Sequence, residues 1–304
     1  MKVGARSPVP FDLAILYRGS LSSCNYACEY CPFAKRREDR AAVRRDGEQL
    51  ARFVAWVAAQ TERKLGVLFT PWGEALVRRH YREAVIALSH MEHVVKVAAQ
   101  TNLSVRPGWL SESRIDRVAL WCTYHPSQVL RHAFLTRCAE LDRLGLRYSV
   151  GMVGLRDDLE EIEAVRRALP PAVYLWVNAF KRDPAHYDAS QLARLSTVDP
   201  LFSLNARHHD SLGRSCQTGH RAITVDGDGV ARRCHFVAEP IGNIFEQRLD
   251  QLLDRRPRAC PRETCGCHIG YVHLDELGMY ETFGDGLLER IPAGRLLGQV
   301  SRRG

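Results

Sequence analysis

The chain has 304 residues, of which 45% are hydrophobic and 26% charged; this is an ordinary globular composition that excludes disordered, collagen-like and coiled-coil proteins. The formal net charge of +8 comes almost wholly from arginine and is weak evidence for an acidic partner. No uncharged apolar run approaches the roughly 20 residues that span a bilayer, and residues 1–20 lack a signal-peptide pattern, so we expect a cytoplasmic protein without a membrane partner.

Short apolar runs alternate with longer amphipathic segments over the first two hundred residues. The apolar runs predict strands at residues 11–17, 65–69, 94–99, 119–124, 148–153 and 173–178. The segments between them predict helices at residues 47–60, 75–90, 110–118, 127–144 and 158–169. Strand–helix units in a row favour parallel strands joined by right-handed crossovers. We therefore expect an α/β fold, a partial (β/α)6 TIM-type barrel with its chemistry at the carboxyl ends of the strands.

The pattern changes after about residue 181. Residues 186–195 predict a helix, and residues 222–234 predict a β-hairpin because Asp-Gly-Asp-Gly separates two β-type runs. Asn243 is a candidate N-cap for a helix over residues 244–253. The predicted domains are a barrel at 1–204, a small C-terminal β-hairpin and helix iron–sulfur domain at 205–275, and a tail at 276–304.

Ten cysteines are more than a cytosolic enzyme usually carries, and eight of them stand in two groups. In a reducing compartment, cysteines clustered in sequence bind metal more often than they form disulfides. Cys122 and Cys138 lie outside both groups. We expect these two to be small buried hydrophobic residues.

The first group, Cys24, Cys28 and Cys31, follows the first predicted strand. Three thiolates on one tight loop can hold three irons of a four-iron cubane, and they leave the fourth iron open for a substrate or cofactor. The alternatives are a zinc site lacking its fourth ligand and a ferredoxin-like electron-transfer loop. Zinc would need a nearby fourth Cys or His, and none follows Cys31 before His80.

The spacing C-x3-C-x-aromatic-C, with Tyr30 at the aromatic position, resembles the signature of the radical S-adenosylmethionine (radical SAM) superfamily. The resemblance implies a 4Fe–4S cluster whose open iron chelates S-adenosylmethionine. One electron from the cluster would cleave this cofactor to methionine and a 5′-deoxyadenosyl radical, which removes hydrogen from a substrate. The resemblance also implies a flavodoxin or ferredoxin as reductant.

Further residues fall near predicted strand ends in the order of the superfamily's cofactor-binding segments. Trp72-Gly73-Glu74 resembles the Gly-Gly-Glu type segment that binds the methionine amino group, although Trp72 replaces the first Gly. Asn102 and Asn178 are explained equally well as turn residues that satisfy the local backbone. The resemblance assigns these residues to cofactor binding: Tyr30, Gly73, Glu74, Asn102, Gly154 (a loose match to the segment lining the adenine site) and Asn178.

The second group contains five candidate metal ligands, which are Cys216, Cys234, Cys260, Cys265 and Cys267. The pattern C-x12-G-x4-C formed by Cys216, Gly229 and Cys234 resembles the twitch domain, a shortened SPASM domain that carries an auxiliary 4Fe–4S cluster. The last three cysteines show C-x4-C-x-C where the family has C-x2-C, so which two of them are ligands is open. A structural zinc site is the alternative. A cluster with four cysteine ligands would relay electrons, and one with an open iron would bind substrate.

We therefore predict a radical SAM oxidoreductase or modifying enzyme with an unknown substrate, either a peptide or protein side chain or a small molecule. The alternatives are an RNA-modifying radical SAM enzyme and a non-catalytic iron–sulfur or zinc protein. No RNA-binding module is recognised, which disfavours nucleic acid as the partner.

Overall fold

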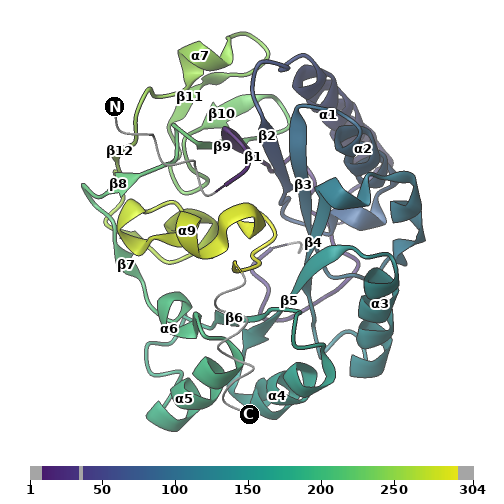
Figure 1. The fold of residues 1–304 in the computed structure, drawn as a ribbon, viewed down its shortest axis with the longest axis vertical. Helices are drawn as coiled ribbons and strands as arrows, with labels where there is room; N and C mark the ends of the chain where they lie inside the picture. Colours follow the sequence, from purple (N-terminus) through teal and green to yellow (C-terminus); the bar gives the residue numbers. More distant parts are fainter. Residues whose placement is uncertain (1–8, 34–36, 294–304) are drawn as a thin grey trace.

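The computed structural model of the chain describes residues 9–33 and 37–293. Its main element is one nine-stranded sheet with the order β11-β10-β9-β1-β2-β3-β4-β5-β6, which curves into an open arc (Figure 1). Six strands pair in parallel in chain order: β1 (Leu13–Tyr17), β2 (Leu65–Phe69), β3 (Val94–Thr101), β4 (Val118–Thr123), β5 (Arg147–Gly154) and β6 (Leu175–Ala179). The six predicted strands are confirmed, and the arrangement agrees with a partial barrel.

Helices cover the outer face of the arc. They are α1 (Arg40–Ala58), α2 (Arg79–Ser89), α3 (Arg131–Arg143), α4 (Leu159–Ala168) and α5 (Ala189–Val198), followed by the single turn α6 (Phe202–Asn205). The first helix begins earlier than predicted because the Asp39 side chain accepts a hydrogen bond from the Ala42 backbone and caps it.

The predicted helix over residues 110–118 is wrong. Two 3₁₀ segments, Pro107–Glu112 and Ile115–Arg117, occupy this connection instead. Val118 already pairs with Val97 as the first residue of β4. The turn at Ser113 and the early start of β4 leave too little chain for an α-helix.

The inner face of the arc is filled by the C-terminal segment. Inward-facing strand residues, among them Leu16, Leu68 and Trp121, share an apolar cluster with Phe283 and Leu288. This segment contains α8 (His268–Tyr271) and α9 (Met279–Phe283), and Figure 1 shows α9 in the hollow of the arc. The predicted tail therefore contributes residues such as Phe283, Leu287 and Leu288 to the core, and residues 294–304 lie outside the described residues.

The predicted hairpin is confirmed and extends the barrel sheet. β9 (Ala222–Val225) pairs in parallel with β1 and antiparallel with β10 (Val230–Arg232), which pairs with β11 (Pro240–Asn243). The predicted helix over residues 244–253 is wrong, since only α7 (Leu249–Leu252) forms. Asn243 ends β11, and its side chain accepts from the backbone of Phe245 in a turn, so it caps no helix. The domain boundary at residue 204 stays a prediction.

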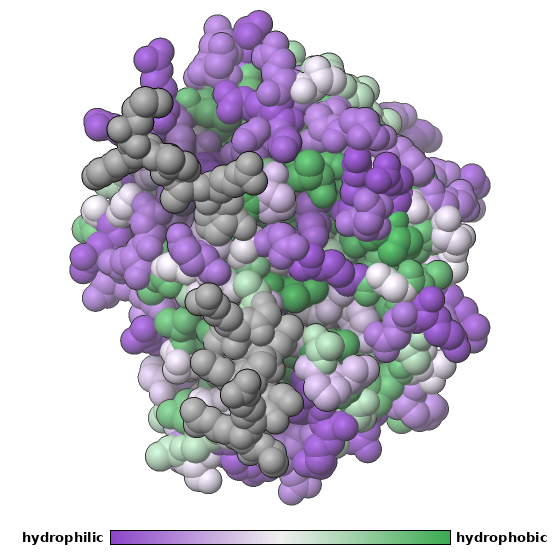
Figure 2. Space-filling view, in the orientation of Figure 1, coloured by the Kyte–Doolittle hydropathy of each residue, from purple (hydrophilic) through white to green (hydrophobic). Residues whose placement is uncertain are grey.

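Two small ribbons complete the C-terminal part. β7 (His209–Asp210) pairs with β13 (Thr264–Cys265), and β8 (Ser215–Cys216) pairs with β12 (Arg258–Ala259). On the face in Figure 2, hydrophilic residues dominate the periphery and hydrophobic residues show in smaller groups between them. None of the helices in the described ranges has the length and apolarity to cross a membrane.

Candidate functional site

The first cysteine group lies on the loop that follows β1, and the start of this loop is held by charged side chains. The carboxylate of Glu38 accepts hydrogen bonds from the Ser22 backbone at 2.6 Å and from the Ser23 hydroxyl at 2.5 Å. Arg78, just before α2, donates to the same hydroxyl at 2.8 Å. The segment that carries the cysteines is therefore anchored to two other parts of the barrel.

The three thiols share this one short loop, as predicted. Cys28 is buried, and Cys24 and Cys31 are half-buried. The Sγ of Cys24 accepts from the backbone of Tyr26 at 3.4 Å, and the backbone of Cys31 donates to the carbonyl of Cys28 at 3.2 Å. Burial raises the pKa of the Cys24 and Cys28 thiols. Three soft sulfur donors on one loop fit the ligand set of a four-iron cubane with one iron free of protein ligands.

Gly73 lets the segment after β2 run directly against the cysteine loop. A Cβ atom at Gly73 would collide with the carbonyl oxygen of Ser23. The backbone of Glu74 donates to the same carbonyl at 3.2 Å, and that of Trp72 donates to Leu21 at 3.2 Å. Glycine is required here for close backbone approach.

Glu74 connects the ends of β2 and β3. Its buried carboxylate accepts from the Leu76 backbone at 3.0 Å, the Thr101 hydroxyl at 2.8 Å and the Asn102 backbone at 2.5 Å. Burial raises its pKa to about 7, and these hydrogen bonds act in the opposite direction. A carboxylate has about four acceptor positions, so one remains for a further donor.

Asn102 serves both the local turn and the cysteine loop. Its Oδ1 accepts from the Ser104 backbone at 3.0 Å, which is the turn role. Its Nδ2 donates to Oδ1 of Asn25 at 2.9 Å and to Sγ of Cys24 at 3.8 Å. The structure therefore brings Glu74 and Asn102 together with the three cysteines.

Tyr30 packs against a histidine that the sequence analysis missed. Its hydroxyl shares a 2.7 Å hydrogen bond with Nδ1 of His125, and the two rings stack. Burial lowers the pKa of His125 to about 4, so the ring is neutral at physiological pH. Gln128 accepts from the backbone of Ala27 at 2.9 Å. Both missed residues follow the end of β4, so the rule that chemistry gathers at strand ends would have found them.

Gly154 and Asn178 lie at the carboxyl ends of the neighbouring strands β5 and β6. The carbonyl of Gly154 accepts from the Tyr187 hydroxyl at 2.6 Å. The Asn178 side chain is exposed and forms no hydrogen bond within the described ranges. Both residues are on the predicted edge of the sheet, but no hydrogen bond within the described ranges joins either of them directly to the cysteine loop. Their role in cofactor binding stays a prediction.

Four cysteines of the second group surround one small cavity, together with apolar residues such as Phe236 and Leu274. The four are Cys216, Cys234, Cys260 and Cys265. Burial raises the pKa of Cys234 and Cys265 to about 12. Cys267 does not line this cavity and is exposed.

A tetrahedral zinc site needs four ligands within about 2.3 Å of one point. The described part of the chain contains no group of three or more His, Cys, Asp or Glu side chains that could hold a single metal ion. Four thiols around one cavity are a ligand set that suits either a four-iron cubane or a zinc ion.

A row of three rings connects the regions of the two cysteine groups. Phe33, two residues after Cys31, lies 4.6 Å from Trp72 between ring centroids. Trp72 lies 4.9 Å from His235, the residue after Cys234. Trp72, which replaces the expected glycine, therefore stands between the two groups.

Solved structures share this fold. One is "Native anSMEcpe with bound AdoMet", with a TM-score of 0.52, 14% identity and coverage of 79% of this chain and 80% of that chain. Another structure of anSMEcpe, with bound AdoMet and Cp18Cys peptide, also has a TM-score of 0.52. Streptococcus suis SuiB has a TM-score of 0.50 and 14% identity, over 81% of this chain and 66% of that chain. No protein-family model and no curated protein matches the sequence.

Proposed function

We propose that this protein is a radical SAM enzyme that cleaves S-adenosylmethionine reductively and carries a second, auxiliary 4Fe–4S cluster. The observation that carries the proposal is the packing of the Cys24, Cys28 and Cys31 loop against Glu74 and Asn102 at the carboxyl edge of the sheet. The fold shared with anSMEcpe, which binds AdoMet, supports it.

The three thiolates would hold three irons of the first cluster. When bound, this cluster would supply the electron that cleaves S-adenosylmethionine and starts radical chemistry on the substrate. The remaining acceptor position of Glu74 would receive the amino group of the cofactor, and this positive charge would favour the ionised carboxylate. Asn102 would orient the cysteine loop through Cys24 and Asn25. Tyr30 and His125 would hold the other end of the loop.

The auxiliary cluster would be held by the four cysteines around the cavity, Cys216, Cys234, Cys260 and Cys265. This assignment selects Cys260 and Cys265 from the last three cysteines of the group. Four cysteine ligands leave no iron open for substrate, so electron relay is the role we assign to this cluster. The rings of Phe33, Trp72 and His235 lie between the two cluster sites, which supports an electronic connection. A flavodoxin or ferredoxin would reduce the first cluster.

The substrate class is a peptide or protein side chain or a small molecule. The peptide alternative is supported by the bound peptide in one anSMEcpe structure. The reaction is either an oxidation or another modification that begins with hydrogen abstraction.

The test is cofactor turnover by the protein reconstituted with iron and sulfide without oxygen. We expect 5′-deoxyadenosine after addition of S-adenosylmethionine and dithionite, and about eight irons per chain for two cubanes. Cys28→Ala should abolish 5′-deoxyadenosine and retain about four irons. Cys138→Ala, a buried cysteine in α3, is the matched control and should retain both. Turnover that survives Cys28→Ala would contradict the proposal.

A further inference from the structure

Three of the four cysteines around the cavity lie on the two small ribbons, and the fourth comes from the barrel sheet. Cys216 ends β8 and pairs with Arg258 of β12, and Cys260 follows β12 directly. Cys265 ends β13, which pairs with β7. Cys234 follows β10, which pairs with β9 and β11 and with neither ribbon. Other contacts must therefore hold Cys234 against the remaining three cysteines.

The side chain of Arg233 makes one such contact, with the ribbon formed by β8 and β12. Arg233 stands directly before Cys234. Its Nη1 donates to the carbonyl of Ala259 at 3.0 Å, and its Nη2 donates to the carbonyl of Arg258 at 3.3 Å. Both acceptors belong to β12, just before Cys260. The planar guanidinium can reach two neighbouring carbonyls at once, whereas an ammonium group lacks this fixed array of donors.

Arg262 makes the reciprocal contact. It lies two residues after Cys260, and it lines the cavity together with the four cysteines. Its Nη1 donates to the carbonyl of Phe236 at 3.2 Å, and Phe236 lies two residues after Cys234. Each arginine therefore extends from one cysteine-bearing segment to the backbone of the other, so the two segments are joined twice.

Both arginines use backbone carbonyls as acceptors, and neither forms an ion pair with a carboxylate within the described ranges. Their neighbours differ in this respect, since Arg232 pairs with Asp226 at 2.9 Å and Arg258 pairs with Asp254 at 3.2 Å. The Nε atom of Arg233 is buried without a hydrogen-bond partner. Two cations without a paired carboxylate therefore flank a cavity that is lined by four thiols.

We propose that Arg233 and Arg262 are positioning residues of the auxiliary cluster, which hold Cys234 against the other three ligands and raise the reduction potential of the site. The inference rests on the proposed function, because it concerns the second cluster assigned there. Reduction adds one negative charge to a four-iron cluster, so a nearby cation stabilises the reduced form more than the oxidised form. A raised potential favours acceptance of an electron, which suits a relay.

The experiment follows the second cluster alone, in a full-length Cys28→Ala parent from which the first cluster is removed. The parent is reconstituted with iron and sulfide without oxygen, and about four irons per chain would establish the second cluster. Two quantities are then measured for each variant. The first is the midpoint potential, by redox titration with electron paramagnetic resonance of the reduced cluster. The second is the rate of iron release to a chelator.

Removal of either charge should lower the midpoint potential. We expect the equilibrium constant for one-electron reduction to fall about fivefold in Arg233→Gln and in Arg262→Gln, as for loss of one charge beside a largely hydrated site. A fivefold change is about 40 mV, because a tenfold change is about 59 mV for one electron. Arg44→Gln, on the exposed face of α1, changes the net charge equally and should keep the parental potential.

Arg233→Lys separates the positioning role from the charge. Lysine keeps the charge but cannot bridge the carbonyls of Ala259 and Arg258, so the potential should stay near that of the parent while iron release becomes about tenfold faster. Arg232→Gln is the matched control for release. The Arg232 guanidinium contacts Asp226 of its own hairpin and not the ribbons, so this variant should release iron at the parental rate.

A parental rate of iron release in both Arg233→Lys and Arg262→Gln would overturn the positioning role. Unchanged potentials in Arg233→Gln and Arg262→Gln would overturn the charge effect, and so would an equal shift in Arg44→Gln. Loss of all iron in Arg233→Gln but not in Arg232→Gln would support the positioning role, and Arg262→Gln would then report the potential.

Neither measurement requires cleavage of S-adenosylmethionine. A parent without iron would contradict the auxiliary cluster of the proposed function itself. A parent with about four irons, together with variants that match it in potential and release rate, would contradict only the roles of the two arginines.

Discussion

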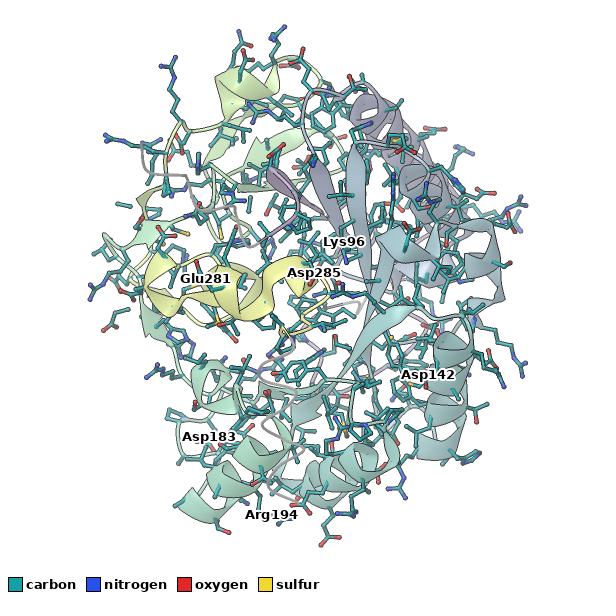
Figure 3. The ribbon with its side chains drawn as sticks, in the orientation of Figure 1. Lys96, Asp142, Asp183, Arg194, Glu281 and Asp285 are labelled. Carbon is teal, nitrogen blue, oxygen red and sulfur yellow. The ribbon has the colours of Figure 1, made fainter. Side chains whose placement is uncertain are left out.

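Lys96 on β3 and Glu289 in the C-terminal segment form an ion pair, with Nζ and Oε1 2.8 Å apart and side chains 5% and 0% exposed. Arg147 of β5 reaches the same carboxylate at 3.4 Å and also pairs with Asp285. Figure 3 labels Lys96 and Asp285 near the middle of the molecule, where the C-terminal segment crosses the sheet. These contacts fix the segment that fills the inner face of the barrel.

Lys96→Met should destabilise the protein strongly, because it leaves the Glu289 carboxylate buried with a single weaker partner. We expect a loss of about 3–5 kcal/mol in the free energy of unfolding, measured by urea denaturation. The double variant Lys96→Met, Glu289→Met should recover most of this loss, since no buried charge remains. Arg79→Met, which breaks an exposed pair with Glu83, should have little effect. Equal losses in Lys96→Met and Arg79→Met would contradict the assignment of Lys96 and Glu289 as a stabilising buried ion pair.

Gly73→Ala should displace the cysteine loop, because its Cβ would meet the backbone carbonyl of Ser23. The expected result is iron content near four per chain in place of eight, with 5′-deoxyadenosine formation lost and the circular dichroism spectrum retained. Gly108→Ala is the matched control, since no atom lies within 4 Å of the added Cβ. A Gly73→Ala protein with full iron content would show that the loop does not depend on this contact.

Cys265→Ser and Cys267→Ser should differ although the two residues are separated by one glycine. Cys265 lines the cavity shared with Cys216, Cys234 and Cys260, and Cys267 does not. We expect about four irons per chain in Cys265→Ser and about eight in Cys267→Ser, measured by iron assay and by the intensity of the cluster absorption. About eight irons in Cys265→Ser and about four in Cys267→Ser would identify Cys267, and not Cys265, as the cluster ligand.

Glu74 should make the metal-free protein less stable as the pH rises from 4.5 to 7. Burial raises its pKa from 4.5 to about 7, so between these values the folded chain binds a proton that the unfolded chain has lost. Glu74→Gln removes this contribution, on the order of 3 kcal/mol. Urea unfolding at pH 5 and pH 7.5 should show the variant gaining stability relative to the wild type. Parallel pH profiles of the unfolding free energy in the wild type and in Glu74→Gln would contradict the raised pKa of Glu74.

The strands and the first cysteine loop were predictable because their signals are local. Short apolar runs identify β1 to β6, and three cysteines within eight residues identify the loop. Gly73 and Glu74 were singled out because their segment after β2 resembles a cofactor-binding segment of the radical SAM superfamily. His125 and Gln128 were missed although both follow the end of β4. The strand-end rule points to them, but their partners Tyr30 and Ala27 are about a hundred residues away in sequence, so only the structure shows what they contact.

The errors come from tertiary contacts that override local pattern. The apolar run after Asn243 resembles a helix, but β11 pairs with β10 and the chain turns at Phe245. Residues near Phe283 and Leu288 pack against the inner face of the sheet. No local sequence pattern predicts this packing, because it depends on the shape of a sheet formed by distant segments. The proposed choice of Cys265 over Cys267 as a ligand likewise rests on the cavity and has no signal in the sequence.

The pairing of Ala14 with Ala222 places the first strand between two partners, β2 and β9, that are synthesised far apart in time. During synthesis, one hydrogen-bonding edge of β1 stays unpaired until almost three-quarters of the polypeptide has emerged from the ribosome. Such an edge is open to pairing with other nascent chains. The nine-stranded sheet is therefore completed late in synthesis.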